Sequence, residues 1–157
     1  MATSILGGVQ ACADAILRSP ATALLARLAV AAPFLFSGFA KLADFNGAIG
    51  EVRGLTGLEP AALFAALVIA TQLGGSALLI AGARLTWIGA ALLAAFTALA
   101  TLSAHAFWLK PAAEQVLNRN IFIEHISIIG GLAAVAILAA RTERRGPDGG
   151  AGVSGRP

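Results

Sequence analysis

The chain has 157 residues, of which 58% are hydrophobic and only 12% are charged, and its mean hydropathy is +0.83. This composition excludes an ordinary soluble domain, because the apolar excess is spread over several long segments. Eleven Lys and Arg against eight Asp and Glu leave a net charge of +3. Nucleic acid is therefore not an expected partner, and the clustering of basic residues in one tail is typical of membrane topology instead.

Residues 1–20 are predicted to form an amphipathic helix on the cytoplasmic surface of a membrane. Apolar side chains recur there at helical spacing, and polar side chains share the opposite face. The apolar positions are Ile5, Leu6, Val9, Ala13, Ile16 and Leu17, and the polar positions are Gln10, Asp14 and Arg18.

Four apolar segments are each long enough to cross a bilayer as a helix. About 20 residues at about 1.5 Å per residue match a hydrocarbon core of about 30 Å. A very short link joins the second and third segments, which favours an up-down bundle. The predicted fold is therefore an all-α, integral membrane four-helix bundle over residues 21–140, followed by a tail, residues 141–157, predicted to be disordered. The predicted spans are residues 21–42, 60–83, 85–108 and 121–140.

The distribution of basic residues orients this bundle. Most of them lie on one side of the predicted spans, namely Arg18, Arg27, Arg84, Arg141, Arg144, Arg145 and Arg156. The positive-inside rule then places both termini in the cytoplasm and residues 43–59 and 109–120 on the periplasmic side of a bacterial inner membrane. In the first of these outer loops, Phe45, Ile49 and Val52 stand at helical spacing, which predicts a short helix that caps the bundle.

Four ionisable residues lie about one turn from the outer ends of the spans: Lys41, His105, Glu124 and His125. Such a residue costs about 2.5–3.5 kcal/mol at full membrane depth, which favours a functional site. Each span carries its polar groups on one stripe, so the stripes are expected to converge on a pocket open to the outer leaflet, with Lys41 and Glu124 as an ion pair. His125 lies about 100° around the helix from Glu124, so those two need not share the pocket.

Structural interpretations of the same residues compete with this one. Lys41 near a helix end is also typical of a lysine that snorkels to the interface. An ion pair between Lys41 and Glu124 is also compatible with a clasp that has no chemistry. His105 followed by Trp108 is also typical of an interfacial aromatic belt.

Other residues are expected to have packing roles only. Gly74 and Gly130 each have a small residue four positions away, which favours close contact between helices. Arg27, two turns into the first span, is expected to snorkel to the cytoplasmic surface. The only cysteine, Cys12, excludes an intramolecular disulfide and any multi-cysteine metal site within this sequence.

Four segments carry a family resemblance: ARLAVAAPFLFSGFAKLADF (26–45), ATQLGGSALLIAG (70–82), FWLK (107–110) and NRNIFIEHISIIGGL (118–132). Over roughly residues 20–140 the chain resembles the DoxX family. The resemblance implies a four-helix protein of the bacterial inner membrane, often a subunit of an oxidoreductase. Relatives in this family include the membrane subunit of thiosulfate:quinone oxidoreductase and proteins that support oxidative-stress or cofactor-maturation systems.

The first functional hypothesis is a quinone-interacting, redox-associated accessory subunit. Its candidate proton carriers are Glu124, His125 and His105. Its candidate quinone or lipid pocket consists of Lys41, Gln72, His105, Trp108, Phe36 and Asn120. The sequence has no haem, flavin or iron–sulfur motif and no diagnostic metal spacing, so electrons are expected to come from another membrane or periplasmic redox subunit.

The second hypothesis is a non-catalytic structural or assembly subunit, whose Gly-rich helix faces pack against itself as a homo-oligomer or against a larger membrane complex. A small transporter or proton channel ranks last, because the four spans contain no pair of broken helices.

Overall fold

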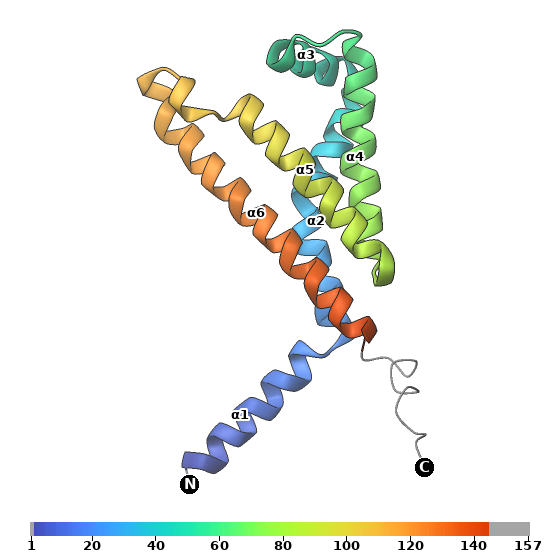
Figure 1. Cartoon of the computed structure of the whole chain (residues 1–157), viewed down its shortest axis with the longest axis vertical. Coiled ribbons are helices and arrows are strands. Elements are labelled where there is room, and N and C mark those ends of the chain that lie inside the picture. The colour runs from blue at the N-terminus through green and yellow to red at the C-terminus, as the bar shows by residue number, and fades with distance from the viewer. Residues whose placement is uncertain (1, 145–157) are drawn as a thin grey trace, which may run out of the picture.

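The computed structural model describes residues 2–144 (Figure 1). Within that range it contains α-helices and two short 3-10 turns, and no β-strand. Four of the helices are long and apolar enough to cross a membrane, which confirms the predicted all-α bundle with four spans. Most of the predicted tail, residues 145–157, lies outside the described residues, but residues 141–144 continue the last helix and are not a tail.

The first three spans agree closely with the prediction, because the third covers Thr86–Leu109, and only the last one differs from it. Helix α2 covers Pro20–Ala43 and α4 covers Ala61–Ala81. Helix α5, Thr86–Ala104, ends before His105 and is followed by the turn η2, Phe107–Leu109. Helix α6, Ala112–Arg144, begins well before the predicted position 121.

The early start of α6 has a physical reason. Hydropathy marks where a helix enters the hydrocarbon, whereas helical hydrogen bonds can begin earlier in polar sequence. Glu114 lies in the first turn of α6, where a carboxylate interacts favourably with the helix dipole, and no Gly or Pro interrupts residues 112–120. Asn118 and Asn120, predicted to precede the helix, therefore lie on it, and their side chains point to definite faces.

The bundle has two distinct ends. At one of them, called the α3 end, lie α3 and η2; at the other, the η1 end, lie the turn η1 (Ala83–Leu85), the start of α2 and the end of α6. Helix α5 packs between α4 and α6, and α2 packs against α4 and more lightly against α6. In Figure 1, α6 meets α2 toward the η1 end and diverges from it toward the α3 end. A core cluster joins the four spans: Ala31, Phe34, Leu79, Ala90, Leu93 and Leu132.

Two glycines allow α4 and α5 to approach each other closely. A Cβ atom on Gly89 would lie 2.5 Å from the carbonyl oxygen of Gly75 and 2.5 Å from the backbone nitrogen of Leu79. By contrast, nothing lies within 4 Å of a Cβ placed on Gly74 or Gly130. Close packing through small residues is therefore present, but the prediction that Gly74 and Gly130 provide it within the chain is wrong.

Arg27 forms hydrogen bonds to backbone carbonyl groups toward the η1 end, and its snorkelling to the cytoplasmic surface stays a prediction. Its Nη1 donates to the carbonyl oxygen of Ile80 at 3.1 Å, and its Nε donates to the carbonyl oxygen of Ala23 at 3.1 Å. The last carbonyl groups of a helix have no partner within that helix and carry partial negative charge. Arg27 of α2 therefore caps the end of α4 and holds the two helices together at the η1 end.

Helix α1, Ala2–Leu17, extends away from the bundle (Figure 1). Its apolar side chains from position 6 onward are not covered by the rest of the described chain; Leu6, Val9, Ile16 and Leu17 are all more than half exposed. A helix with such a face is suited to the surface of a bilayer. Its location on the cytoplasmic surface stays a prediction.

Helix α3, Phe45–Thr56, covers the end of the bundle, as predicted for the first outer loop. It begins where the side chain of Asp44 accepts a hydrogen bond from the backbone N–H of Gly47, and it ends at Gly57, whose φ is 67°. Ala48 and Val52 are buried and form a second apolar cluster with α4.

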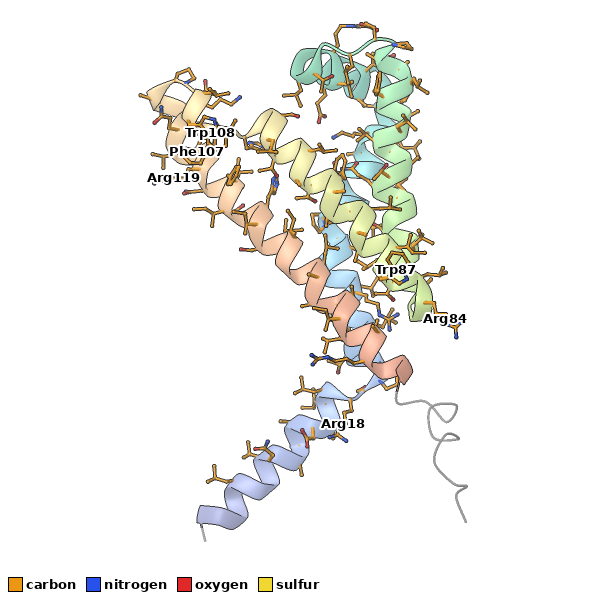
Figure 2. All side chains as sticks on the ribbon, viewed as in Figure 1. Arg18, Arg84, Trp87, Phe107, Trp108 and Arg119 are labelled. Atoms are coloured by element: carbon orange, nitrogen blue, oxygen red, sulfur yellow. The ribbon has the colours of Figure 1, made fainter. Side chains whose placement is uncertain are left out.

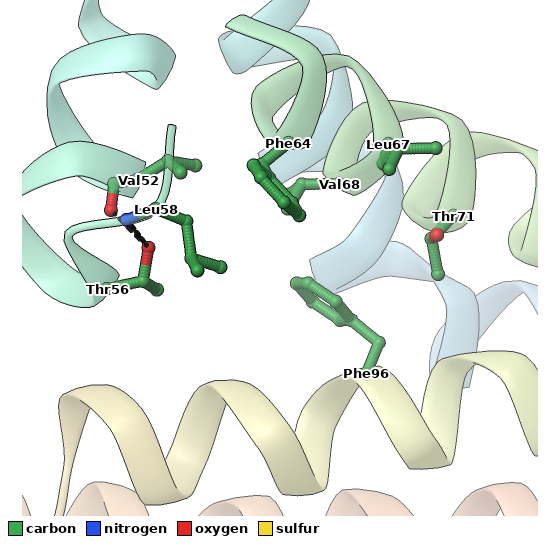
Figure 3. A pocket seen from close by; sticks show the side chains of 8 residues that line it. All are labelled: Val52, Thr56, Leu58, Phe64, Leu67, Val68, Thr71 and Phe96. Atoms are coloured by element: carbon green, nitrogen blue, oxygen red, sulfur yellow. Dashed lines mark hydrogen bonds between the residues drawn. The ribbon is translucent and has the colours of Figure 1, made fainter. Parts of the chain in front are cut away.

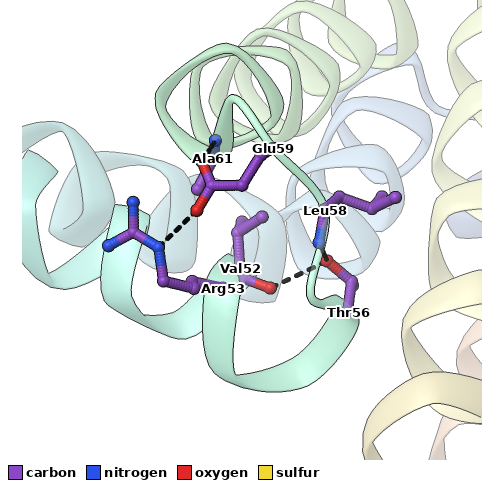
Figure 4. A network of polar contacts seen from close by, with 6 residues as sticks. All are labelled: Val52, Arg53, Thr56, Leu58, Glu59 and Ala61. Atoms are coloured by element: carbon purple, nitrogen blue, oxygen red, sulfur yellow. Dashed lines mark hydrogen bonds and ion pairs between the residues drawn. The ribbon is translucent and has the colours of Figure 1, made fainter.

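The link between α3 and α4 is held by a polar network (Figure 4). The Arg53 Nε donates to one carboxylate oxygen of Glu59 at 2.5 Å, and the other oxygen accepts from the backbone N–H of Ala61 at 2.8 Å. The Thr56 hydroxyl donates to the carbonyl of Val52 and accepts from the backbone N–H of Leu58.

This network predicts a pH dependence. The hydrogen bond from Arg53, and then that from Ala61, lower the pKa of Glu59 below its ordinary value. A lowered carboxyl pKa stabilises the folded state above the unfolded pKa, and the effect is lost as the pH falls through the folded pKa. The stability difference between the parent and Glu59→Gln should be constant from about pH 7 to about pH 5 and should shrink as the pH falls further, through the lowered pKa of Glu59.

Thermal unfolding in detergent over that pH series measures the difference. Arg53→Gln, which removes the partner of the Glu59 carboxylate, should show the same pH dependence. A difference that stays unchanged down to about pH 3 would contradict the role of the Glu59 carboxylate.

Candidate functional site

The polar stripes of the four spans form two networks, not the single pocket predicted. One lies between α2 and α4, and the other lies between α5 and α6. Within residues 2–144, no hydrogen bond or ion pair between side chains connects the two networks.

The network between α2 and α4 is centred on Ser37. Its hydroxyl oxygen accepts from Lys41 Nζ at 3.2 Å and from Gln72 Nε2 at 3.0 Å. Lys41 also forms an ion pair with Glu51, with 2.9 Å between Nζ and Oε2. The predicted pair of Lys41 and Glu124 is therefore wrong, because α3 folds back over α2 and brings its own carboxylate to the lysine.

Gln72 is buried in this network, where its side chain links α4 to α2 through Ser37. Its side chain is buried, with 4% exposure, and its Oε1 has no hydrogen-bond partner in the described chain. Ser76, one turn further along α4, is also fully buried, and its hydroxyl has no partner there. Phe36 on α2 is 80% exposed and makes no aromatic contact with another described ring.

The network between α5 and α6 is built around two imidazoles, named here the histidine pair: His105 and His125. His105 caps the C-terminus of α5, and its backbone N–H donates to the carbonyl of Thr101 at 2.8 Å. His125 lies on α6. The two ring centroids are 5.4 Å apart, the ring planes cross at 74°, and both residues are half-buried.

Each imidazole is held through its Nδ1. The Nδ1 of His125 lies 2.7 Å from the hydroxyl oxygen of Thr101, and the Nδ1 of His105 lies 2.9 Å from Oδ1 of Asn118. The partner of His125 lies on α5 and the partner of His105 lies on α6. These two hydrogen bonds fix the orientation of both rings.

The surrounding hydrogen bonds determine which nitrogen carries the proton. The Thr101 hydroxyl donates to the carbonyl of Thr97 at 2.5 Å, so it must accept from His125. The side-chain nitrogen of Asn118 donates to the carbonyl of Glu114 at 2.9 Å, so its oxygen must accept from His105. Each neutral ring therefore carries its proton on Nδ1 and leaves the Nε2 lone pair free to accept.

Three aromatic rings lie next to the histidine pair in the chain. Phe107 and Trp108 follow His105 in η2, and Phe122 precedes His125 on α6. The three rings contact one another edge to face, with centroids 5.0 to 5.8 Å apart. Figure 2 shows Phe107 and Trp108 at the α3 end, with Trp87 near the opposite end. This cluster fits both a ring-binding wall and the predicted interfacial belt.

Glu124 precedes His125 on α6 and interacts with it electrostatically, but the two side chains form no hydrogen bond. The Glu124 side chain is exposed, and it forms no hydrogen bond or ion pair in the described part of the chain. This agrees with the prediction that the two residues need not share a pocket. Asn120 is likewise exposed, whereas Asn118 is buried.

A cavity of about 200 Å³ lies apart from the histidine pair (Figure 3). It is lined by Val52, Thr56, Leu58, Phe64, Leu67, Val68, Thr71 and Phe96. Phe96 of α5 enters the cavity and also contacts Phe34 of α2, whereas Thr101 of the same helix faces α6. None of the side chains predicted for a quinone pocket lines this cavity. Its volume is below the roughly 300–1,000 Å³ of a pocket that encloses a whole ligand.

A comparison with protein families identifies the family of the chain. Residues 22–106 match the model of the DoxX family, which is more than half of the chain. The chain belongs to the DoxX family. Comparison with curated proteins and with solved structures gives no match. With its four apolar helices, this DoxX-family chain is a membrane protein.

The region that matches the DoxX family contains only one of the two histidines. It includes α2 to α5 and His105, and it ends before η2 and α6, where His125 lies. Among residues 2–144, no three His, Cys, Asp or Glu side chains are placed so as to hold a metal ion.

Two residues of the site in this DoxX-family protein are not among those predicted from the sequence. Thr101 and Asn118 fix the two imidazoles, although Asn120 was the asparagine predicted for the pocket. One signal was present: Asn118 and His125 are seven residues apart, which places them on the same face of a continuous helix. The spacing is informative only if Asn118 and His125 lie on one helix, whereas the predicted span begins at residue 121.

Proposed function

We propose that this DoxX-family protein is a quinone-interacting accessory subunit of a redox complex in the bacterial inner membrane. One observation carries the proposal: two imidazoles with ring centroids 5.4 Å apart are fixed through Nδ1 and keep both Nε2 atoms available. A quinol donates hydrogen bonds through its hydroxyl groups, and a free Nε2 is the matching acceptor.

The same proposal gives the protein an orientation. The basic residues at the η1 end and in the C-terminal sequence favour an orientation in which both termini face the cytoplasm. The histidine pair then lies in the outer leaflet, close to the periplasmic surface, where water is within reach for proton release.

The chemistry is the oxidation of a quinol to a quinone, with release of two protons and two electrons. Each proton passes from a quinol hydroxyl to an Nε2 and then to water at the periplasmic surface. The two electrons pass to a redox centre of a partner subunit, because this sequence has no haem, flavin or iron–sulfur motif. Quinone reduction is the same sequence of steps in reverse.

The contacts at Nδ1 suit this role. The partners of His105 and His125, the oxygens of Asn118 and Thr101, are acceptors and remain satisfied whether a ring is neutral or protonated. Neither ring must rotate when it gains a proton. Phe107, Trp108 and Phe122 supply an apolar wall for the quinone ring.

Tryptophan fluorescence tests quinone binding. The chain has two tryptophans: Trp108, three residues after His105, lies at the α3 end, and Trp87 lies near the opposite end (Figure 2). In a Trp87→Phe variant, a short-tailed benzoquinone should quench Trp108 saturably. In the matched Trp108→Phe variant, only weak and non-saturable quenching of Trp87 is expected.

Replacing the histidines in the Trp87→Phe background completes the test. In that background the quinol is added as a competitor of the quenching benzoquinone, and His105→Gln and His125→Gln should each weaken quinol binding about tenfold, because one hydrogen bond from a quinol hydroxyl to Nε2 is worth about 1.4 kcal/mol. Equal quenching of both tryptophans, or an affinity that does not change in either histidine variant, would overturn the proposed site.

A structural or assembly role is the second candidate function. It is favoured by α6, of which only 6% of the membrane-spanning window is buried within the described chain. If assembly were the whole function, histidine variants would leave partner activity intact, whereas removal of the chain would abolish the complex.

A further inference from the structure

Helix α6 presents one continuous face that the rest of the described chain does not cover. Its buried and half-buried residues, such as Asn118, His125 and Leu132, face α5 and the core. On the opposite side every position is exposed: Asn120, Ile123, Ser127, Gly130, Ala134 and Ile137. Ile123 and Ile137 are 55% and 53% exposed, respectively.

These exposed positions alternate at intervals of three and four residues. This is the spacing of the a and d positions of a heptad, the seam along which two parallel helices pack. Asn120, Ser127 and Ala134 occupy a, and Ile123, Gly130 and Ile137 occupy d. The heptad therefore runs along the uncovered face, on the side away from the chain's own bundle.

The residue types on this seam fit a contact within a bilayer. Helices in lipid associate through small residues that let their backbones approach and through polar groups that bond across the interface. Gly130 has nothing within 4 Å of an added Cβ, so the chain itself leaves this position open. Asn120 at an a position is a residue that specifies register in paired helices.

Two charges beside the seam indicate the partner. Arg119 occupies g and Glu124 occupies the next e position; both are exposed, and neither forms an ion pair within the described residues. In a parallel pair of helices, g of one helix lies beside the following e of the other. Arg119 of one copy would thus meet Glu124 of a second copy, twice by symmetry.

We propose that a second copy of this chain docks α6 against α6 to form a parallel dimer. The two-fold axis runs along the membrane normal, because both copies insert with the same topology. Helix pairing then gives a partner to Glu124, which lies about one turn inside the predicted span, where an unpaired ionisable residue is costly. This inference is independent of quinone binding.

Cysteine cross-linking in membranes tests the interface. In a Cys12→Ser background, Ser127→Cys should form a disulfide-linked dimer on mild oxidation. Ser103→Cys, an exposed serine on α5, is the matched control and should not. If Ser127→Cys cross-links no faster than Ser103→Cys, the proposal is overturned.

A charge exchange tests the pairing of Arg119 with Glu124. Arg119→Glu and Glu124→Arg should each raise the dimer dissociation constant about tenfold in mild detergent, and the double exchange should restore it. Circular dichroism checks that all variants keep their helix content. A double variant no better than the single ones would overturn the pairing, and purified protein that is monomeric throughout would overturn the dimer.

Discussion

Replacement of Gly89 by alanine should destabilise the bundle more than any other single methyl group added to a glycine of α4 or α5. The new Cβ would lie 2.5 Å from the Gly75 carbonyl oxygen and from the Leu79 backbone nitrogen. These are backbone atoms, so relief requires that α4 and α5 separate. We expect a loss of at least the roughly 1–3 kcal/mol typical of overpacked cores.

The matched control for Gly89→Ala is Gly74→Ala. Gly74 also lies in this helical hairpin, but nothing is within 4 Å of its added Cβ, so its effect should stay within about 0.5 kcal/mol. Thermal unfolding and the yield of folded protein in detergent measure both variants. Similar stabilities for the two would show that α4 and α5 do not cross at Gly75 and Gly89.

The combined variant His105→Gln/His125→Gln should lose quinol-dependent electron transfer in the native complex by a factor of about 100 or more. Proton transfer by a positioned side chain contributes about 10²–10⁴ to a rate, and glutamine cannot take the proton. The amount of assembled complex, measured on native gels, should not change.

Thr101→Val separates the positioning of His125 from its proton transfer. This change removes the acceptor at Nδ1 and keeps the size of the side chain, so His125 can turn and use either tautomer. We expect about a tenfold loss of rate and a changed pH profile. Ser103→Ala, on the same helix but exposed, should leave both unchanged. A fall in complex abundance in parallel with activity would indicate a structural clasp.

Local sequence features predicted the spans and the capping helix well. Hydropathy over about 20 residues and the spacing of Phe45, Ile49 and Val52 depend only on neighbours along the chain. The predicted start of α6 was wrong, because hydropathy detects only the part of a helix inside the membrane and not its continuation into water.

The composition of the site was harder to predict, because it depends on how helices cross. Lys41 was assigned to Glu124, but the fold brings Glu51 to it through α3. Gln72 and His105 were expected in one pocket, but they face different neighbours across α4 and α5. A stripe of polar residues predicts which face of a helix is buried, but it does not predict which other helix packs against that face. Gly74 and Gly75 are adjacent in sequence, but only Gly75 lies where α4 crosses Gly89 of α5, and the sequence alone does not show this crossing point.

Nitrogen-15 NMR of the imidazoles tests the proposed function most directly. The chain contains only two histidines, so the spectrum holds one pair of rings. We predict that both neutral rings carry the proton on Nδ1, and that a quinol shifts both Nε2 signals while the Nδ1 signals change little. Protonated Nε2 in the neutral rings, or unchanged Nε2 signals at saturating quinol, would contradict the proposal that His105 and His125 receive the protons.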